Sequence, residues 1–364
     1  MLQQPTKEER ELIVKAIFGQ HQTIDAHSTR FDAYFKYYCS VVCPGSEGNA
    51  VIEVDTLALQ SHTDVLSCIR TIVQNPNVSF NEFADQTVKP KSPNAVPREK
   101  EYIASLTTQV LIGIDGPLQH YSWDNSDPTK YLGSRWEGNT SFLSFVESVF
   151  SAGAPHGQHF DQTPRVIEAI SHKKSLKAWK LNKRYEIEII GTNNLLEHLL
   201  LDPKTRTLKV FHQVFFLRAH LEKSRDEPLD LSFEDSLRMG TLPPRLLLET
   251  LVTFHEILFP ITSIMDTKWI DFVRTDAADM GFNFWGERLA RLYDVVERPP
   301  PTNAIVAWFE RHTSERNALT VAIIGVLLSV LFGLLSFIVG LLQLILAWVV
   351  YKYPQINHTE STTR

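Results

Sequence analysis

Three side chains that can bind metal ions lie close together in the segment PHGQHFD, at His156, His159 and Asp161. Imidazole and carboxylate groups at this spacing can hold zinc or iron, and His172 follows near enough in the chain to join them. However, the spacing matches no metal motif with a defined mechanism, and with 13 histidines in the chain a chance cluster is common. These residues are candidates only: the sequence predicts no metal centre, and any cofactor is unknown.

Cys39 and Cys43 stand four residues apart on one face of an expected helix, and Cys68 is the remaining cysteine. Two thiols at this spacing can chelate an ion or form a cross-link, but without a second pair they are more typical of core positions. Three cysteines are too few for a disulfide framework, which suits a reducing compartment. The chain also lacks nucleophile-elbow, P-loop, dinucleotide-binding, zincin and kinase motifs, which weakens the hypothesis of an enzyme without removing it.

A basic segment, HKKSLKAWKLNKR, surrounds Trp179 with Lys173, Lys174, Lys177, Lys180, Lys183 and Arg184. For a basic stretch held near a membrane, anionic lipid headgroups are the natural partner. Two alternatives stay open: a basic face that is only solvated, which is the commoner case, and a winged-helix-like fold that binds nucleic acid. The formal net charge of −6 argues against nucleic acid as a partner of the whole protein.

The residues from Ala318 to Tyr351 carry no charged side chain, and this long apolar run predicts a transmembrane helix. As one helix the run would be about 51 Å long, against a hydrocarbon core of about 30 Å, so part of it must lie outside the hydrocarbon. Aromatic and basic residues at its far end resemble an interfacial belt, which places one span from Gly325 to Trp348.

Small residues recur within this run at Gly325, Ser329, Gly333, Ser336 and Gly340. Their spacing places them on one face of a helix, where small side chains let two backbones approach closely. We therefore consider a homo-oligomer formed through the membrane helix. The alternative is that glycine and serine are simply frequent in membrane helices.

The N-terminal segment MLQQPTKEERELIVKAIFG has no basic stretch followed by an apolar one, so no signal peptide is readable. We therefore predict a single-pass membrane protein with residues 1–298 in the cytosol and a polar tail, residues 352–364, on the other side. Which membrane is unknown. Sequons at Asn77, Asn139 and Asn357 would carry glycans wherever they reach the lumen, which would make the protein a glycoprotein.

A proline spacer and an amphipathic stem, residues 299–316, separate the membrane run from the soluble part. RPPPT is typical of a stiff polyproline spacer. In the stem, Ile305, Trp308 and Phe309 share one face with charges opposite, as in a helix that lies at a membrane interface. Packing of the stem against the soluble domain is the alternative.

The fold class predicted for residues 1–298 is a helix-dominated α+β domain, with a candidate subdivision at the Pro- and Lys-rich segment near 87–98. Hydrophobic periodicity and capping signals predict helices over residues 7–18, 31–42, 61–73, 99–112, 140–151, 164–181, 195–201, 215–223, 245–259 and 287–297. Alternation predicts strands over residues 50–57, 185–190 and 206–212. In the first helix, Thr6 with Glu9 forms a capping box, and the expected apolar face consists of Leu12, Ile13, Ala16 and Ile17.

The block from Gly191 to Leu251, the motif Trp308-Phe309-Glu310-Arg311 and the terminal apolar run together resemble a family of uncharacterised filamentous-fungal proteins with a C-terminal membrane anchor. The similarity covers about the C-terminal half of the chain. It implies a fungal source and a membrane anchor, and it brings no activity, cofactor or catalytic residue.

These observations predict a membrane-tethered, non-enzymatic binding or scaffold protein of unknown partner, which self-associates through its membrane helix. The alternative is a membrane-anchored enzyme with an unrecognised site, for example an accessory factor of a fungal biosynthetic pathway. An ion channel would need a polar pore face, for which the helix offers only Thr320, Ser329, Ser336 and Gln343.

Overall fold

A computed structural model describes residues 2–19, 31–43, 58–118, 135–151, 164–260, 281–297 and 318–352. The chain divides into two compact units, residues 1–298 and residues 299–364, and each is described by itself. The strand predicted over 50–57, the spacer and stem at 299–316, and all of the polar tail except Lys352 lie outside the described residues.

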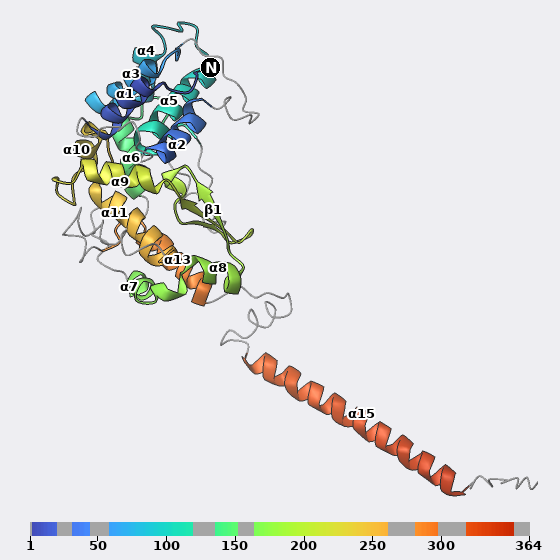
Figure 1. The fold of residues 1–364 in the computed structure, drawn as a ribbon. Coiled ribbons are helices and arrows are strands. Elements are labelled where there is room, and N and C mark those ends of the chain that lie inside the picture. Colours follow the sequence, from blue (N-terminus) through green and yellow to red (C-terminus); the bar gives the residue numbers. More distant parts are fainter. Residues whose placement is uncertain are drawn as a thin grey trace, which may run out of the picture. The chain divides into compact units, whose positions relative to one another are not determined.

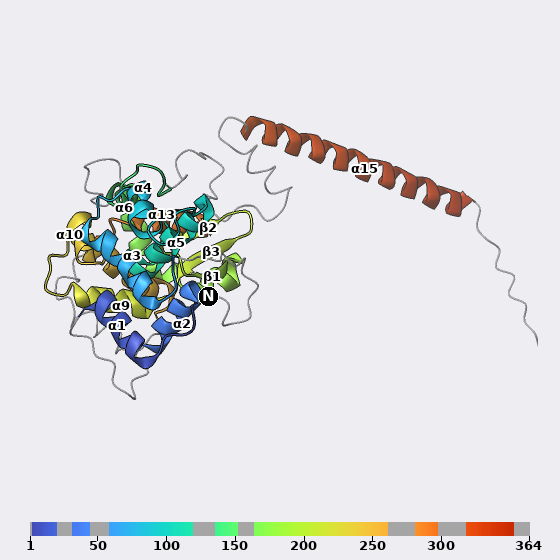
Figure 2. The same ribbon diagram turned by 90° about the horizontal axis from the view of Figure 1, so that it is seen from above.

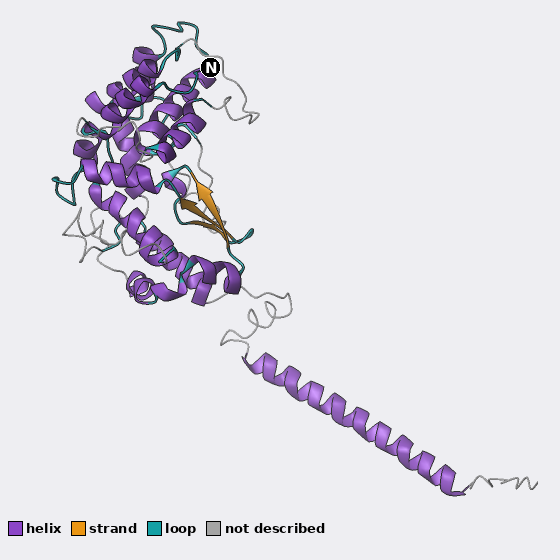
Figure 3. Cartoon of the chain, viewed as in Figure 1, coloured by secondary structure: helices purple, strands orange, loops and turns teal. Residues whose placement is uncertain are grey.

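Helices dominate the described part of the first unit, which also contains a small sheet, as predicted (Figures 1 and 3). In chain order the elements are α1 (Lys7–Phe18), α2 (Asp32–Val42), α3 (His62–Gln74), α4 (Phe80–Thr87), α5 (Pro97–Ile112), α6 (Phe142–Ser151), α7 (Pro164–Ser171), η2 (Lys173–Ser175), α8 (Ala178–Tyr185), β1 (Glu188–Thr192), η3 (Leu195–Glu197), β2 (Leu200–Asp202), β3 (Thr207–Phe211), α9 (Val214–Lys223), α10 (Phe233–Arg238), α11 (Pro244–Val252), the π-helical η4 (Thr253–Leu258) and α13 (Gly286–Glu297). The second unit contains α15 (Ala318–Lys352).

The sheet has the strand order β1–β3–β2 and lies along one side of the helices in both views (Figures 1 and 2). β1 runs parallel to β3, with Glu188 opposite Thr207, and β2 runs antiparallel to β3, with Asp202 opposite the same Thr207. Asp202 closes the turn between β2 and β3, because its carboxylate accepts hydrogen bonds from the Lys204 amide (2.9 Å) and the Thr205 hydroxyl (2.6 Å).

The helix predicted over residues 195–201 is wrong beyond Glu197. Asn194 caps the single turn η3 by accepting the Leu196 amide (3.2 Å), but Leu199 then adopts a positive φ of 58°, which a right-handed helix does not allow. The following residues Leu200–Asp202 pair with β3 as β2. For residues 200–202, hydrogen bonding to β3 therefore decides the conformation, although the spacing of the leucines is typical of a helix.

The single helix predicted over residues 164–181 is also wrong, because it breaks into α7, η2 and α8. At the break the Ser175 hydroxyl donates to the carbonyl of His172 (2.8 Å), and Leu176 buries its side chain in the core. Burial of this leucine and the serine turn stabilise a change of direction that the periodicity of the sequence does not reveal.

The capping box of α1 is confirmed: the Thr6 hydroxyl accepts the Glu9 amide, and the Glu9 carboxylate accepts the Thr6 amide (2.8 Å). The predicted apolar face is partly wrong, since Leu12 is 57% exposed. The buried side chains of α1 are instead Ile13, Val14, Ile17 and Phe18. The face is rotated because α1 packs against both α3 and α9.

Aromatic side chains from α1, α2 and α9 form one part of the core. Phe18 meets Tyr34 edge to face, with ring centroids 4.8 Å apart, and His220 lies 4.3 Å from the ring of Phe216. At the rim of this cluster the Lys223 ammonium donates to the carbonyl of Ile17 (2.6 Å), in the last turn of α1. Burial lowers the pKa of Lys223 to about 8.

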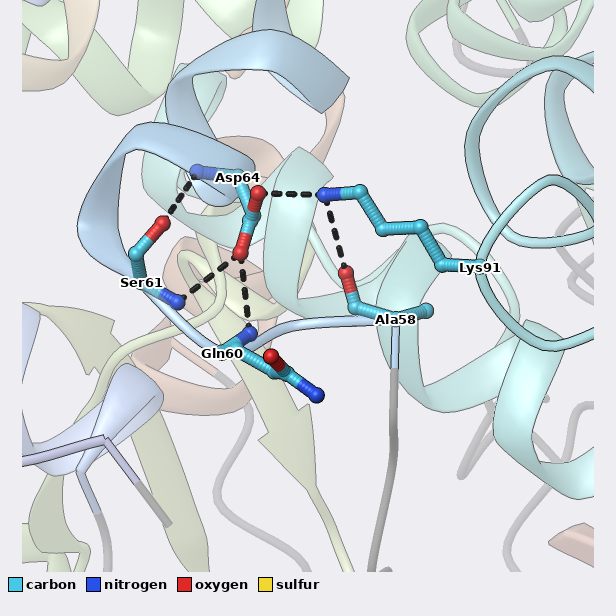
Figure 4. A network of polar contacts seen from close by, with 5 residues as sticks. All are labelled: Ala58, Gln60, Ser61, Asp64 and Lys91. Atoms are coloured by element: carbon cyan, nitrogen blue, oxygen red, sulfur yellow. Dashed lines mark hydrogen bonds and ion pairs between the residues drawn. The ribbon is translucent and has the colours of Figure 1, made fainter.

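The segment after α4 is fixed to α3 by a network of polar contacts (Figure 4). The Lys91 ammonium pairs with the Asp64 carboxylate and also reaches the carbonyl of Ala58 (3.4 Å). The other Asp64 oxygen accepts the amides of Gln60 and Ser61, at 2.9 Å each. Burial alone would raise the pKa of Asp64, but these hydrogen bonds outweigh it and the pKa is lowered.

Loss of the α3 cap should measurably destabilise the protein. Ser61→Ala removes the hydroxyl that accepts the Asp64 amide and is expected to lower the free energy of unfolding by about 1 kcal/mol. The measurement is urea unfolding of the full chain in detergent micelles. Thr63→Ala, an exposed change in the same turn, is the control, and equal effects of the two changes would contradict the capping role.

Candidate functional site

Among the described residues, helix α15 is the element whose length and composition most clearly indicate a role. Its part from Gly325 to Lys352, 28 residues, is long and apolar enough to cross a membrane, and none of its most apolar window is buried against the rest of the chain. The predicted helix over residues 318–351 is therefore confirmed as a helix of the expected length and composition. At its far end the Lys352 ammonium lies 4.7 Å from the centre of the Trp348 ring, a pairing typical of a membrane interface.

The small residues of α15 form an open face within the chain. Apart from the adjoining backbone of the helix itself, a methyl group added at Gly325, Gly333 or Gly340 would meet no atom within 4 Å. The Ser329 hydroxyl donates to the carbonyl of Gly325 (2.9 Å), so its polar group is already satisfied inside the helix. At about 100° per residue, these four positions and Ser336 lie within an arc of about 80°.

The basic segment forms η2 and α8, and most of its charged side chains are exposed. Lys173, Lys174, Lys183 and Arg184 are exposed, while Lys177 and Lys180 are half-buried. Lys173 pairs with Glu256 (3.2 Å). On α8, Trp179 is 47% exposed, and the Lys180 ammonium lies 5.7 Å from the centre of its ring. We name Trp179, Lys180, Lys183 and Arg184 the α8 face.

The candidate metal ligands His156, His159 and Asp161 lie outside the described residues. His172 is described and exposed; its ring Nδ1 contacts the hydroxyl of Ser171 (3.0 Å), and the ring stacks on Tyr293 with centroids 5.6 Å apart. Among the described residues, no group of three or more His, Cys, Asp or Glu side chains has an arrangement that could hold a metal ion.

All three cysteines are buried free thiols. Cys43 donates to the carbonyl of Gln3 (3.2 Å). Its hydrogen bond with Cys39, together with burial, raises the pKa of the Cys43 thiol well above its usual range. Burial raises the pKa of Cys68 to about 11. Because the thiolate is the reactive form, the raised pKa values make Cys43 and Cys68 less reactive than exposed thiols.

The sequons at Asn77 and Asn139 are both exposed, and the Asn139 side chain accepts a hydrogen bond from Asn81 (3.0 Å). The third sequon, Asn357, lies outside the described residues. The two described acceptor sites are therefore open to modification on the folded surface.

A buried polar cluster, which the sequence analysis missed, joins α11 to the start of α13. The Glu249 carboxylate has no solvent exposure and accepts three backbone amides, from Asn283 (2.7 Å), Phe284 (2.8 Å) and Trp285 (3.1 Å). The Trp285 indole donates to the Thr250 hydroxyl (2.8 Å). Burial raises the pKa of Glu249 to about 7, although the three amides act in the opposite direction.

Arg288 extends this cluster to the sheet. Its guanidinium donates to the carbonyls of Leu196 (2.7 Å) and His198 (2.5 Å) and lies 5.0 Å from the centre of the Trp285 ring. Burial, with Arg288 close by, lowers the pKa of His198 to about 3. His198 Nδ1 accepts the Phe211 amide (3.2 Å), so in the neutral ring the proton is on Nε2. Glu249 and His198 are both buried, so the cluster joins α11, the start of α13 and the residues before β2 to one another.

Comparisons with protein-family models, curated proteins and solved structures give no match.

The raised pKa of Glu249 predicts a pH dependence of stability. The unfolded chain releases this proton near pH 4.5 and the folded chain only near pH 7, so stability should fall as pH rises between these values, by on the order of 3 kcal/mol. Glu249→Gln should remove this slope, as measured by urea unfolding of the full chain in micelles from pH 5 to pH 8.

The comparison is made against the wild type at each pH. His198 loses stabilisation as pH falls below its unfolded pKa, but it does so in both proteins and cancels in the difference. Glu256→Gln, which changes a half-exposed glutamate in η4, is the matched control and should keep the wild-type slope. An unchanged slope in Glu249→Gln would show that Glu249 is ionised in the fold throughout this range.

Proposed function

We propose that the protein is a membrane-tethered binding or scaffold protein whose first unit works at a bilayer surface. The observation that carries the proposal is the apolar part of α15, Gly325 to Lys352. Its 28 residues correspond to about 42 Å of helix, which matches a hydrocarbon core of about 30 Å with both headgroup layers. An exposed apolar surface of this size strongly favours lipid over water.

We further propose that two copies associate through the small-residue face of α15. In lipid there is no hydrophobic drive between helices, so association depends on close packing, which glycine and serine permit. Gly325, Gly333 and Gly340 leave the helix backbone uncovered on this face. Self-association would present paired copies of the first unit, an arrangement suited to a scaffold.

The proposed orientation places the first unit in the cytosol. The three buried free thiols fit a reducing compartment. The exposed sequons at Asn77 and Asn139 supply a direct readout, because a lumenal domain would present both to the glycosylation machinery.

Removing the membrane helix should release the protein from membranes. The full chain is expected in the membrane pellet after alkaline carbonate extraction, and a chain without residues 318–352 in the supernatant. Glycosidase treatment should leave the mobility of the full chain unchanged. Recovery of the full chain in the supernatant would contradict the tether, and a mobility shift lost in Asn77→Gln/Asn139→Gln would contradict the cytosolic orientation.

Bulk on the small-residue face should weaken self-association. Gly333→Leu with Gly340→Leu places two branched side chains where the backbones would meet, and the signal in a membrane two-hybrid assay is expected to fall several-fold. The matched control adds bulk on the opposite face, with Leu334→Phe and Ile338→Phe, and should leave the signal unchanged. Equal signals from both variants and the wild type would rule out this face as the contact.

A further inference from the structure

The α8 face combines an aromatic ring with three basic side chains on one side of a helix. At about 100° per residue, Trp179, Lys183, Lys180 and Arg184 lie within an arc of about 140°. Ala178 and Leu181 occupy the remaining side and are buried. The fold therefore fixes the direction of this face, because α8 cannot rotate without exposing its core side chains.

The positive charge of the α8 face is not cancelled by its neighbours. Glu186, which follows α8, already pairs with Arg206 (2.8 Å). In the described part of the chain, no carboxylate lies within ion-pair distance of Lys180, Lys183 or Arg184. After Glu186, the next exposed acidic residue along the chain is Glu188 in β1. The face thus presents three charges to solvent around one tryptophan.

The α8 face belongs to the end of the first unit where the connection to α15 begins. In Figure 1, α7, α8 and the end of α13 lie at one end of the unit, and α1 to α5 lie at the other. α13 packs against α7 and ends at Glu297. The residues between α13 and α15, 298–317, can reach at most about 70 Å when fully extended. The connection therefore attaches to the end that carries the basic charge.

We propose that the α8 face docks on the surface of an anionic bilayer, with Trp179 in the headgroup layer and Lys180, Lys183 and Arg184 on lipid phosphates and carboxylates. Tryptophan favours this interface because its ring is apolar and its N–H is polar. Lysine and arginine near an anionic leaflet are attracted without a specific partner geometry. This docking rests on the proposed membrane tether, which supplies the high local concentration that three charges alone would not.

The test uses the full chain in lipid nanodiscs, where both leaflets have the same composition. A spin label is attached to Asn182→Cys, an exposed position on α8 next to the face; the three buried native cysteines stay unlabelled, which the wild type verifies. Collision with water-soluble nickel and with lipid-soluble oxygen is measured in discs of phosphatidylcholine alone and in discs with phosphatidylserine. Phosphatidylserine should lower nickel access at least threefold and raise oxygen access, and high salt should reverse both changes.

Charge reversal identifies the residues involved. In K180E/K183E/R184E the effect of phosphatidylserine should disappear, because each basic residue contributes roughly fivefold to binding at an anionic surface. The matched control, K36E/R70E/R98E, makes the same change of net charge at exposed positions of α2, α3 and α5, at the other end of the unit, and should keep the effect.

The outcomes separate the docking from the tether. Equal nickel access in both kinds of disc overturns the docking, and so does loss of the effect in the control variant. Protection of the label by an added polyglutamate peptide, with no effect of lipid, would assign the face to an acidic protein partner instead. Failure of the chain to enter discs at all would show up earlier, in size-exclusion chromatography, and would overturn the tether.

Discussion

The constraint on which our proposal depends is the large apolar surface of α15, which the described part of the chain leaves uncovered. Its apolar side chains from Val326 to Val350 have no partner in the described part of the chain, whereas the backbone of a helix satisfies its own hydrogen bonds. Hydrocarbon is a favourable surrounding for apolar side chains and for a helix whose backbone hydrogen bonds are satisfied, whereas water is unfavourable for the apolar side chains. In the membrane-tethered arrangement that we propose, residues 298–317 would keep the first unit near the lipid surface at high local concentration.

Helix α13 precedes the residues that connect the two units, and two sets of hydrogen bonds hold it in the first unit. Glu249 of α11 accepts three backbone amides from the residues that lead into α13. Arg288 binds α13 to the carbonyls that precede β2. Among the described residues, α13 is thus joined both to α11 and to the residues that precede β2.

Local signals predicted the elements whose cause is local. The capping boxes of α1 and α3, and the apolar run of α15, depend on residues within a few positions of one another. The basic residues of α8 were readable from composition, but their common face was not, because it depends on the break at Leu176. The Glu249 cluster joins residues 34 to 36 positions apart and has no local pattern. The sheet register and the buried face of α1 were hidden for the same reason.

The bond between Lys223 and the carbonyl of Ile17 joins residues 206 positions apart. The aromatic cluster beside it also joins distant parts of the chain, because Phe18 of α1 and Tyr34 of α2 both pack against Phe216 of α9. During synthesis, the aromatic rings of α1 and α2 therefore lack their packing partner until α9 has been made. The final packing of α1 and α2 therefore depends on residues of α9, which are added to the chain much later during synthesis.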